Sequence, residues 1–374
     1  MSAPEITAIT MPKWGLTMTE GKVVGWLKQQ GQSFAEGEEL LEIETTKITN
    51  VVEAPAGGVL RRIVASAGTT LPVGGLLAVV APSEVSDSEI DGFVAGFAIP
   101  EPATEAGADA EAVSSREIEA AGLRLRYLEL GEGTQIPILL LHGFGADLNT
   151  WMFTQPALAA GQRVIALDLP GHGGSAKDVG AGDAESLTGV VGAVLDGLGV
   201  ERVHLVGHSM GGAIAALLAL RRRERLASLT LIASAGLGAE INAAFIDGFV
   251  RASRRREATE VLNLLVHDPA LVSRTMVEDV LRYKRLDGVT AALTKIAEAC
   301  FADGRQSLDI AAEIAALPMP VQIIWGREDR IIPVSHAEAL AARLPVHIIG
   351  QAGHLPHMEK AAEVNRLIKS FIEA

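Results

Sequence analysis

Three glycines and three apolar residues near the N-terminus recur at an interval of 37 positions. The glycine pairs are Gly21 and Gly58, Gly31 and Gly68, and Gly37 and Gly74, and the apolar pairs are Leu27 and Val64, Leu40 and Leu77, and Ile43 and Val80. A fixed period within so short a segment indicates a structural duplication. Because each copy consists of short apolar runs separated by glycine turns, we expect residues 1–81 to form a small all-β barrel of two similar halves.

One lysine falls on a turn that this pattern predicts. The segments 40–44 and 48–52 have the character of neighbouring strands, and Thr45, Thr46 and Lys47 lie between them. This order places Lys47 on an exposed hairpin. Most surface lysines are simply solvated, but the position within the repeat favours a modified side chain, because a rigid sheet can hold the base of a long, mobile arm.

The sequence Glu44-Thr45-Thr46-Lys47-Ile48, inside the glycine repeat and followed by Ala54-Pro55-Ala56-Gly57, resembles the lipoyl domains of 2-oxoacid dehydrogenase complexes. The resemblance covers nearly all of residues 4–81. It implies that Lys47 carries lipoic acid in amide linkage, placed there by a lipoate-attaching enzyme. A biotin carrier would normally have methionines on both sides of the lysine, and here the neighbours are Thr46 and Ile48.

Residues 82–117 have the composition of a linker. From Pro82 to about Ser115 the chain is rich in Ala, Glu, Asp, Ser and Pro, and no Lys or Arg occurs before Arg116. Ile90, Phe93, Val94 and Phe97 have helical spacing, which predicts one short amphipathic helix over residues 86–97. We expect repulsion between like charges to keep the other residues of this segment extended.

From about Ile118 to residue 374, short apolar runs alternate with helical stretches. This alternation predicts a mostly parallel sheet with crossover helices, and unbroken apolar runs suit strands that are buried on both faces. The expected strands are residues 136–141, 163–168, 203–206, 229–233, 321–325 and 346–349. Between about residues 236 and 307 the periodicity is helical instead, and we expect a helical cap there.

A serine motif follows the strand expected at residues 203–206. Gly207-His208-Ser209-Met210-Gly211 leads directly into the helix-forming residues 212–221. In this setting the glycines of a G-x-S-x-G motif permit the tight strand-to-helix turn that exposes the serine hydroxyl as a nucleophile. The alternative is an ordinary helix N-terminus capped by serine, but the strand, turn and helix together favour the nucleophile.

This motif, together with His142-Gly143-Phe144-Gly145 after one strand and Asp168-Leu169-Pro170-Gly171-His172-Gly173 after the next, resembles the α/β-hydrolase superfamily over about residues 118–374. The resemblance implies a nucleophile at Ser209, an acid at Asp329 and a base at His354, in that order along the chain. His354 would accept the serine proton, and Asp329 would hold its ring in the required tautomer. The backbone N–H groups of Phe144 and Met210 would form the oxyanion hole.

Two choices accompany this assignment. We prefer Asp329 to the adjacent Glu328, because Asp329 fits the G-x-x-D pattern of the superfamily. We expect the remaining histidines, including the four at positions 142, 172, 208 and 357, to have structural or supporting roles.

Charge and composition limit the partners. The formal net charge of −14 would repel nucleic acids and anionic membrane surfaces. No run of about 18 apolar residues occurs, and the N-terminus lacks the features of a signal peptide, so we expect a cytoplasmic protein. Cys300 is the single cysteine, which excludes an intrachain disulfide and a multi-cysteine metal site, and we expect no metal.

A cluster of arginines, Arg254, Arg255 and Arg256, lies in the predicted cap. Such a cluster could contact the phosphates of an acyl acceptor. A solvated helix face explains the same residues more simply.

A lipoyl arm carries acyl groups as thioesters, and a covered serine site can accept an acyl group and pass it on. The two modules on one chain resemble the acetyltransferase components of acetoin dehydrogenase complexes. The resemblance implies transfer of acetyl from a dihydrolipoyl arm on Lys47 to coenzyme A through acyl-Ser209. It also implies two partner enzymes, a thiamine diphosphate-dependent acetoin-cleaving component and a dihydrolipoamide dehydrogenase.

Two alternatives remain open at this stage. Ordinary lipoyl acyltransferases use an H-x-x-x-D-G motif, which this chain lacks, so the acyl-serine could instead be released to water. The protein would then be a thioesterase or esterase with an attached carrier. In the third interpretation the hydrolase part is idle and the chain is a carrier scaffold, which the complete set of serine, acid and histidine makes a poor explanation.

Overall fold

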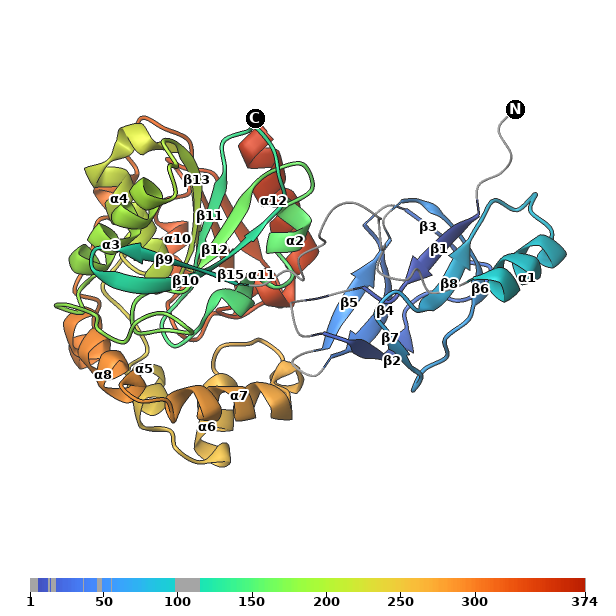
Figure 1. Cartoon of the computed structure of the whole chain (residues 1–374), viewed down its shortest axis with the longest axis horizontal. Coiled ribbons are helices and arrows are strands. Elements are labelled where there is room, and N and C mark those ends of the chain that lie inside the picture. Colours follow the sequence, from blue (N-terminus) through green and yellow to red (C-terminus); the bar gives the residue numbers. More distant parts are fainter. Residues whose placement is uncertain are drawn as a thin grey trace. The chain divides into compact units, whose positions relative to one another are not determined.

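The structure, a computed structural model, describes residues 6–12, 14, 18–35, 37–45, 49–54, 56–97 and 115–373. Contacts divide the chain near residue 113 into an N-terminal carrier unit and a C-terminal hydrolase unit (Figure 1). None of the helices in these ranges is long and apolar enough to span a membrane.

The carrier unit consists of two four-stranded antiparallel sheets. The strand order in the first sheet is β1 (Thr7–Thr10), β8 (Leu76–Val80), β6 (Gly58–Ile63) and β3 (Ser33–Phe34). The order in the second sheet is β5 (Thr49–Glu53), β4 (Glu39–Glu44), β2 (Glu20–Trp26) and β7 (Thr70–Pro72). The expected small all-β fold is confirmed.

The repeat in the sequence is a repeat in the structure. Displacement by 37 residues carries β2, β3 and β4 onto β6, β7 and β8, and the two sheets have corresponding strand orders. Gly31 and Gly68 both have positive φ, at 88° and 87°. Glycine adopts this conformation without the steric cost of a Cβ atom, which explains why both copies retain it.

The first glycine pair recurs for a different reason, which is close packing. A Cβ atom on Gly21 would lie 2.9 Å from Cγ2 of Ile43, and one on Gly58 would lie 2.3 Å from Cγ1 of Val80. Ile43 and Val80 are themselves 37 residues apart, so the same glycine-to-aliphatic contact occurs in both halves.

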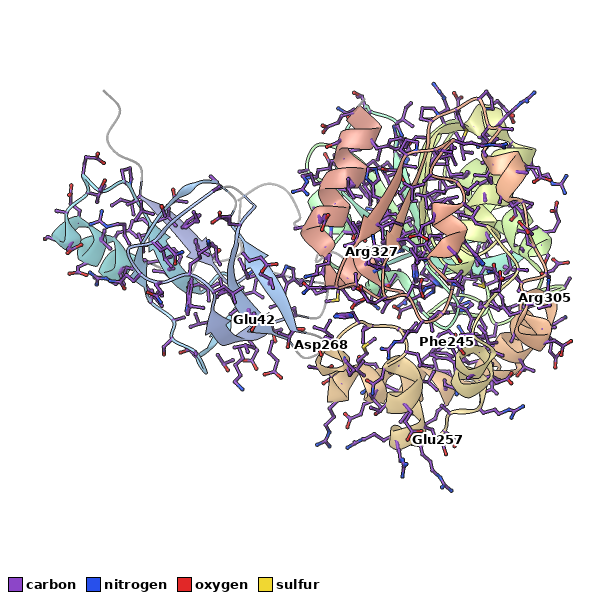
Figure 2. The ribbon with its side chains drawn as sticks, turned by 180° about the vertical axis from the view of Figure 1, so that it is seen from behind. Glu42, Phe245, Glu257, Asp268, Arg305 and Arg327 are labelled. Carbon is purple, nitrogen blue, oxygen red and sulfur yellow. The ribbon has the colours of Figure 1, made fainter. Side chains whose placement is uncertain are left out.

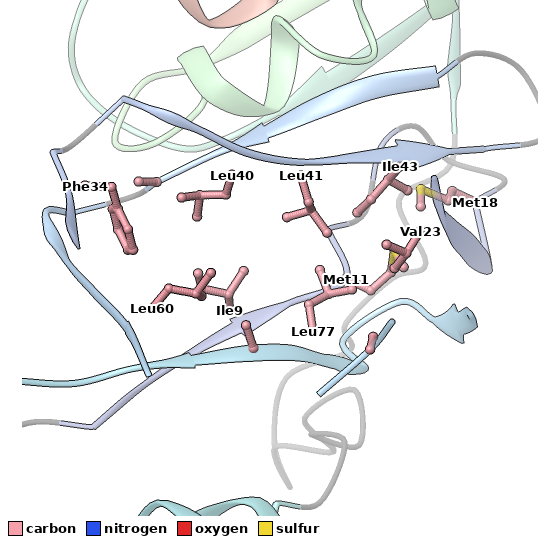
Figure 3. Close-up of a cluster of buried hydrophobic side chains, with 13 residues drawn as sticks. Ile9, Met11, Met18, Val23, Phe34, Leu40, Leu41, Ile43, Leu60 and Leu77 are labelled. Carbon is pink, nitrogen blue, oxygen red and sulfur yellow. The ribbon is translucent and has the colours of Figure 1, made fainter. Parts of the chain in front are cut away.

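Apolar side chains from both sheets form the core of this unit (Figure 3). The seven core residues without any exposed surface are Val23, Leu40, Leu41, Ile43, Leu60, Leu77 and Ala78. Strands β4 and β5 pair with Glu44 opposite Thr49. Lys47 itself, with Thr46 and Ile48, lies outside the described residues.

Helix α1 (Asp87–Gly96) confirms the helix predicted after the carrier strands. It begins with a capping box, in which Ser86 and Glu89 exchange side-chain-to-backbone hydrogen bonds. Its Ile90 is fully buried in an apolar cluster with Leu76 and Val79 of β8. Since the neighbouring β8 residues Leu77 and Ala78 belong to the core between the sheets, β8 packs against the core on one face and against α1 on the other.

Two ion pairs also attach α1 to the sheet. Arg61 and Arg62 of β6 contact Asp87 and Asp91, with N–O distances of 3.1 and 2.5 Å. The start of the segment expected to be a linker is therefore a structured part of the carrier unit.

The hydrolase unit is built on one eight-stranded sheet. Its strand order is β16 (Val346–Ile349), β15 (Val321–Gly326), β14 (Leu226–Ile232), β13 (Val203–His208), β11 (Ile138–Leu141), β12 (Val164–Leu167), β10 (Leu123–Leu130) and β9 (Arg116–Ala120). Strands β11 to β16 are parallel where they pair, and β9 and β10 add an antiparallel edge. All six expected strands are present, whereas β9 and β10 were not among them.

Helices cover both sides of this sheet (Figure 1). Helices α3 (Ala184–Gly197), α4 (Met210–Arg221) and α10 (Ser335–Glu338) lie on one side, and α2 (Gln155–Leu158) and α12 (Ala361–Glu373) on the other. Short elements include η1 (Leu148–Trp151), η2 (Arg223–Arg225) and α11 (Pro356–Glu359).

A helical insertion, residues 236–307, interrupts the sheet between β14 and β15, as predicted. It contains α5 (Ala243–Arg251), α6 (Arg255–Leu262), η3 (Pro269–Leu271), α7 (Arg274–Lys284), α8 (Val289–Cys300) and η4 (Ala302–Gly304), and α9 (Ala311–Ile314) follows it. Helix α5 packs against α6 and α8.

Candidate active site

Ser209 occupies a strained turn between β13 and α4. Its φ and ψ are 52° and −119°, a conformation that residues with a side chain rarely adopt and that costs about 1 to 3 kcal/mol. The start of α4 packs closely against the end of β11, because a Cβ atom on Gly211 would lie 2.4 Å from the carbonyl oxygen of Leu141. This close packing leaves no room for a wider turn. The predicted strand-turn-helix context of the G-x-S-x-G motif is confirmed.

Ser209, His354 and Asp329 form a continuous hydrogen-bonded chain. The Nε2 atom of His354 lies 2.9 Å from Oγ of Ser209, and its Nδ1 atom lies 2.8 Å from Oδ2 of Asp329. The Asp329 side chain is completely buried, and its other oxygen accepts the N–H groups of Ile331 and Ile332. With Nδ1–H donated to a carboxylate that is held in place, Nε2 is free to accept the serine proton.

The structure also shows different contacts for the two adjacent acidic residues, Glu328 and Asp329. Glu328 turns away from His354 and accepts the N–H group of Ala352 at 3.1 Å. Asp329, from the loop after β15, is thus the carboxylate that contacts His354.

The two expected oxyanion donors flank the serine. Met210 is the first residue of α4, where backbone N–H groups lack intrahelical partners. Phe144 lies in the loop after β11, which touches the nucleophile, because a Cβ atom on Gly143 would lie 3.0 Å from Cβ of Ser209. Among the described residues, neither the N–H group of Phe144 nor that of Met210 donates to another protein atom, so both can bind a developing negative oxygen.

Two buried histidines shape the loop that carries Phe144. His142 accepts the N–H group of Leu169 at 3.0 Å, and His172 accepts that of Gly145 at 3.1 Å. Burial lowers the pKa of His142 and lowers that of His172 to about 3. Both rings are therefore neutral acceptors that support the loop, as expected for structural residues.

His208 and His357 form a second buried pair behind the base. The ring of His208 lies 4.9 Å from that of His354 and 4.6 Å from that of His357, between centroids. Burial lowers the pKa of His208 well below its usual value and that of His357 to about 3. In the described part of the chain, neither ring forms a hydrogen bond with the serine hydroxyl, which agrees with a supporting role.

An aromatic contact joins the oxyanion loop to the helical insertion. The ring centroid of Phe144 lies 5.9 Å from that of Phe249 on α5 and 5.9 Å from that of Phe301 after α8. Figure 2 labels Phe245 on the same helix, and its ring lies 5.9 Å from that of Phe249. The insertion thus packs directly on the loop beside Ser209.

Two of the three arginines in the cluster form surface ion pairs. Arg255 lies 2.6 Å from Glu278, and Arg256 lies 2.8 Å from Glu260, one helical turn away. A phosphate would have to compete with these carboxylates, which weakens the case that Arg255 and Arg256 bind an acceptor, and Arg254 forms no such ion pair with another described residue.

Two residues beside the site were not predicted. Arg330 and Glu359 lie next to the acid and near the base, and both bind backbone groups of the insertion. The sequence shows their proximity to Asp329 and His354, but a backbone partner more than 60 residues away leaves no mark in a sequence. No group of three or more His, Cys, Asp or Glu side chains in the described ranges could hold a metal ion.

A mostly parallel eight-stranded sheet with a hydrogen-bonded serine, histidine and aspartate at its strand ends defines the α/β-hydrolase class. In agreement, a family model described as alpha/beta hydrolase fold matches residues 136–361, and a biotin/lipoyl family model described as biotin-requiring enzyme matches residues 7–80. A meta-cleavage product hydrolase from Pseudomonas fluorescens is a similar solved structure, with a TM-score of 0.63, 26% identity, and coverage of 69% of this chain and 97% of that one.

Curated relatives match the whole chain. A dihydrolipoyllysine-residue acetyltransferase component of an acetoin cleaving system from Pseudomonas putida is 48% identical, over 98% of this chain and 99% of the relative. The component with the same name from Cupriavidus necator is 44% identical, over 99% and 98%. A 2-hydroxymuconate semialdehyde hydrolase from Pseudomonas sp. is 35% identical, over 69% of this chain and 93% of the relative. The chain therefore belongs to the α/β-hydrolase fold family and, over its full length, to the family of dihydrolipoyllysine-residue acetyltransferase components of acetoin cleaving systems.

Proposed function

We propose that this protein transfers an acetyl group from a dihydrolipoyl arm on Lys47 to coenzyme A, through an ester on Ser209, as the acetyltransferase of an acetoin cleaving system. The observation that carries the proposal is the fusion of a lipoyl-type carrier with a serine, histidine and aspartate site on one chain. Relatives that share both parts over nearly their full length have this activity in their names.

The residues of the site account for both half-reactions. His354 accepts the proton of Ser209 as Oγ attacks the thioester carbonyl, and Asp329 stabilises the protonated ring. The N–H groups of Phe144 and Met210 bind the oxyanion. His354 then protonates the departing thiolate. In the second half, His354 takes the proton of the coenzyme A thiol, which attacks the acetyl ester, and returns a proton to Oγ of Ser209.

The carrier unit fits covalent attachment at Lys47. The paired positions Glu44 and Thr49 leave residues 45–48 to join β4 to β5, and Lys47 lies within that connection in the sequence. Lipoic acid in amide linkage would supply the thiol that carries the acetyl group. A lipoate-attaching enzyme is therefore a required partner.

The proposed role requires two further components. A thiamine diphosphate-dependent acetoin-cleaving enzyme would load the arm, and a dihydrolipoamide dehydrogenase would reoxidise it. Because coenzyme A is the acceptor, we propose a cytoplasmic location. We also propose the division into a carrier domain at 1–81, a linker at 82–117 whose helix α1 packs on the carrier sheet, and a hydrolase domain at 118–374, in which the helical insertion acts as a cap.

Hydrolysis is the second candidate, because hydrolases such as 2-hydroxymuconate semialdehyde hydrolase match the C-terminal two thirds of the chain. Both reactions share an acyl-serine and differ in what attacks it. A cap that excludes water and a thiol held close to the ester would favour transfer.

The ratio of acetyl-coenzyme A to acetate among the products tests the proposal. The lipoylated full chain is supplied with acetyl-dihydrolipoamide, with and without coenzyme A, and acetyl-coenzyme A and acetate are measured. Transfer predicts acetyl-coenzyme A as the main product and slow acetate release without the acceptor. Acetate as the dominant product at saturating coenzyme A would favour the hydrolase instead.

Three variants test the assigned residues. Ser209→Ala should abolish turnover while leaving folding and lipoylation intact, since it removes the nucleophile and little volume. Lys47→Arg should remove the mass of the lipoyl group from the intact protein. Replacing Arg254, Arg255 and Arg256 together should weaken coenzyme A use without altering small-ester hydrolysis, if these side chains seat its phosphates.

A further inference from the structure

The five-residue segment that follows α6 contacts both loops that carry the acid and the base. We define this anchor segment as residues 263–267, within the helical insertion. It lies outside the helix, and Val266 is almost completely buried. The backbone carbonyl and N–H groups of the segment are directed to partners outside the insertion, as the following contacts show.

The base loop binds the anchor segment in two ways. The N–H group of His354 donates to the carbonyl oxygen of Leu265 at 2.8 Å. The carboxylate of Glu359 accepts the N–H group of Gly353 at 2.7 Å with one oxygen and that of His267 at 2.6 Å with the other. Glu359 therefore joins the residue before the base to the insertion through a single side chain.

The acid loop binds the same segment through Arg330. Its guanidinium donates to the carbonyl oxygens of Asn263 and Val266, the second at 2.5 Å. The backbone of Arg330 is itself fixed, because its carbonyl oxygen accepts the side-chain amide of Asn242, at the start of α5, at 2.8 Å. Two points of the insertion thus hold the residue next to Asp329.

We propose that Glu359 and Arg330 are positioning residues, which fasten the helical insertion to the loops of His354 and Asp329 through the anchor segment. The alignment of the base and acid then depends on the seating of the insertion. Neither side chain is assigned a contact with substrate, so their loss should slow the chemical steps more than it weakens binding. The inference rests on the proposed catalytic role of Ser209, His354 and Asp329.

The chain offers a matched control in Glu328. Its carboxylate also accepts a backbone N–H group of the base loop, that of Ala352 at 3.1 Å, but needs only one oxygen to do so. A glutamine keeps one acceptor oxygen and exchanges the other for a donor. Glu328→Gln can therefore retain its contact, whereas Glu359→Gln must lose either Gly353 or His267.

The experiment compares Glu359→Gln and Glu328→Gln in the full chain. The readouts are kcat and KM for p-nitrophenyl acetate, the rate of fluorophosphonate labelling of Ser209, and amide hydrogen exchange over residues 263–267. We expect Glu359→Gln to lower kcat and the labelling rate by about tenfold or more, since small misplacements of catalytic groups are costly. KM should change less than about threefold, and exchange in the anchor segment should accelerate. Glu328→Gln should stay within about threefold of the wild type in kcat.

Arg330 provides a second, independent test in case Glu359→Gln does not fold. Arg330→Gln should lower kcat with little change in KM, and Arg330→Lys, which retains a charged donor, should recover part of the loss. Folded Glu359→Gln with the same kcat as Glu328→Gln would overturn the inference, as would an Arg330→Gln variant with wild-type kcat. These results differ from those expected if the proposed function itself is wrong. In that case Ser209→Ala would retain turnover, and Ser209 of the wild type would not be labelled.

Discussion

His208 donates its Nε2–H group to the backbone carbonyl oxygen of His354, at a distance of 2.8 Å. His208, the residue before Ser209, therefore holds the backbone of His354, whose ring contacts the serine hydroxyl. A carbonyl oxygen can only accept, so the neutral ring carries its proton on Nε2. Together with the Glu359 contact, this bond fixes the base loop from the sheet side and from the insertion side.

Substitution of His208 should impair alignment of the base. His208→Ala removes both the donor and the ring beside His354, and we expect kcat for a small ester to fall by about tenfold or more. His208→Gln can place an N–H group near the position of Nε2 and should retain more activity than alanine. Steady-state kinetics decide this, with thermal unfolding as the control for folding. Equal activity in the two variants would contradict a role for the hydrogen bond.

The strained backbone at Ser209 predicts a stability difference between two inactive variants. Ser209→Gly removes the nucleophile and relieves the positive φ of 52°, whereas Ser209→Ala retains a Cβ atom in that conformation. We expect the glycine variant to be more stable by about 1 kcal/mol, which is the relief of strain less the entropic cost of glycine. Urea unfolding of the full chain measures the difference. An alanine variant as stable as glycine would mean that the turn is not strained.

Features that are marked by a repeat or by a short motif along the chain were predictable from the sequence. The 37-residue period determined the two halves of the carrier, because Gly31 and Gly68 need the same positive φ. Mostly apolar runs marked the six predicted strands of the hydrolase sheet, of which the inner ones are buried on both faces and the edge strand β16 is largely half-buried. The serine, acid and base were recognisable because each follows a strand in a short motif.

Features that depend on distant partners were not predictable. Strands β9 and β10 carry alternating charged residues such as Arg124 and Arg126, so they lack the apolar signal of the inner strands. The packing of α1 on β8 depends on the apolar residues Leu76 and Val79, whose counterparts by the repeat are Glu39 and Glu42. The helix was foreseen, but its place on the sheet was not.

Gly211 should tolerate no side chain. Its Cβ atom would lie 2.4 and 2.5 Å from two backbone carbonyl oxygens, those of Leu141 and His142, which cannot move without disturbing β11. Gly211→Ala should therefore lower the free energy of unfolding by more than about 2 kcal/mol. Gly189→Ala is the matched control, because it lies in α3 with no atom near its Cβ position. It should raise stability by about 0.5 to 1 kcal/mol through helix propensity, and chemical unfolding measures both.

Helix α1 should be required for the full stability of the carrier unit. Ile90 is completely buried against β8, so Ile90→Ala should cost about 2 to 4 kcal/mol if the cavity does not collapse. Limited proteolysis and amide exchange of the full chain should show earlier opening of residues 87–96. Gly92→Ala, at a position with no neighbouring atom within 4 Å, is the control and should not accelerate opening. Unchanged protection in Ile90→Ala would mean that α1 does not stabilise the sheet.

Buried neutral histidines should make the hydrolase unit sensitive to mild acid. Burial lowers the pKa of His172 and of His357 to about 3, and it lowers the pKa of His142 and of His208 in the same direction. The unfolded chain takes up a proton on each of these rings near pH 6.5, whereas the folded chain takes it up only at lower pH. The unfolded state therefore binds more protons in this window, and folding stability must fall as the pH falls below about 6.5.

The variant His172→Gln shows how much of the dependence of folding stability on pH comes from this one ring. Glutamine keeps an acceptor for the N–H group of Gly145 but cannot be protonated. Each neutral histidine contributes up to about 1.4 kcal/mol per pH unit to the slope. We expect the variant to be less stable at pH 7.5, because it loses the Nδ1 contact with Pro170, and to lose less stability between pH 6.5 and 5. The carrier unit is an internal reference, because all nine histidines lie beyond residue 141, so its calorimetric transition should shift less over this range. Equal slopes for the wild type and His172→Gln would show that His172 takes up its proton over the same pH range in the folded and the unfolded protein, and its role as a neutral acceptor beside the oxyanion loop would then be wrong.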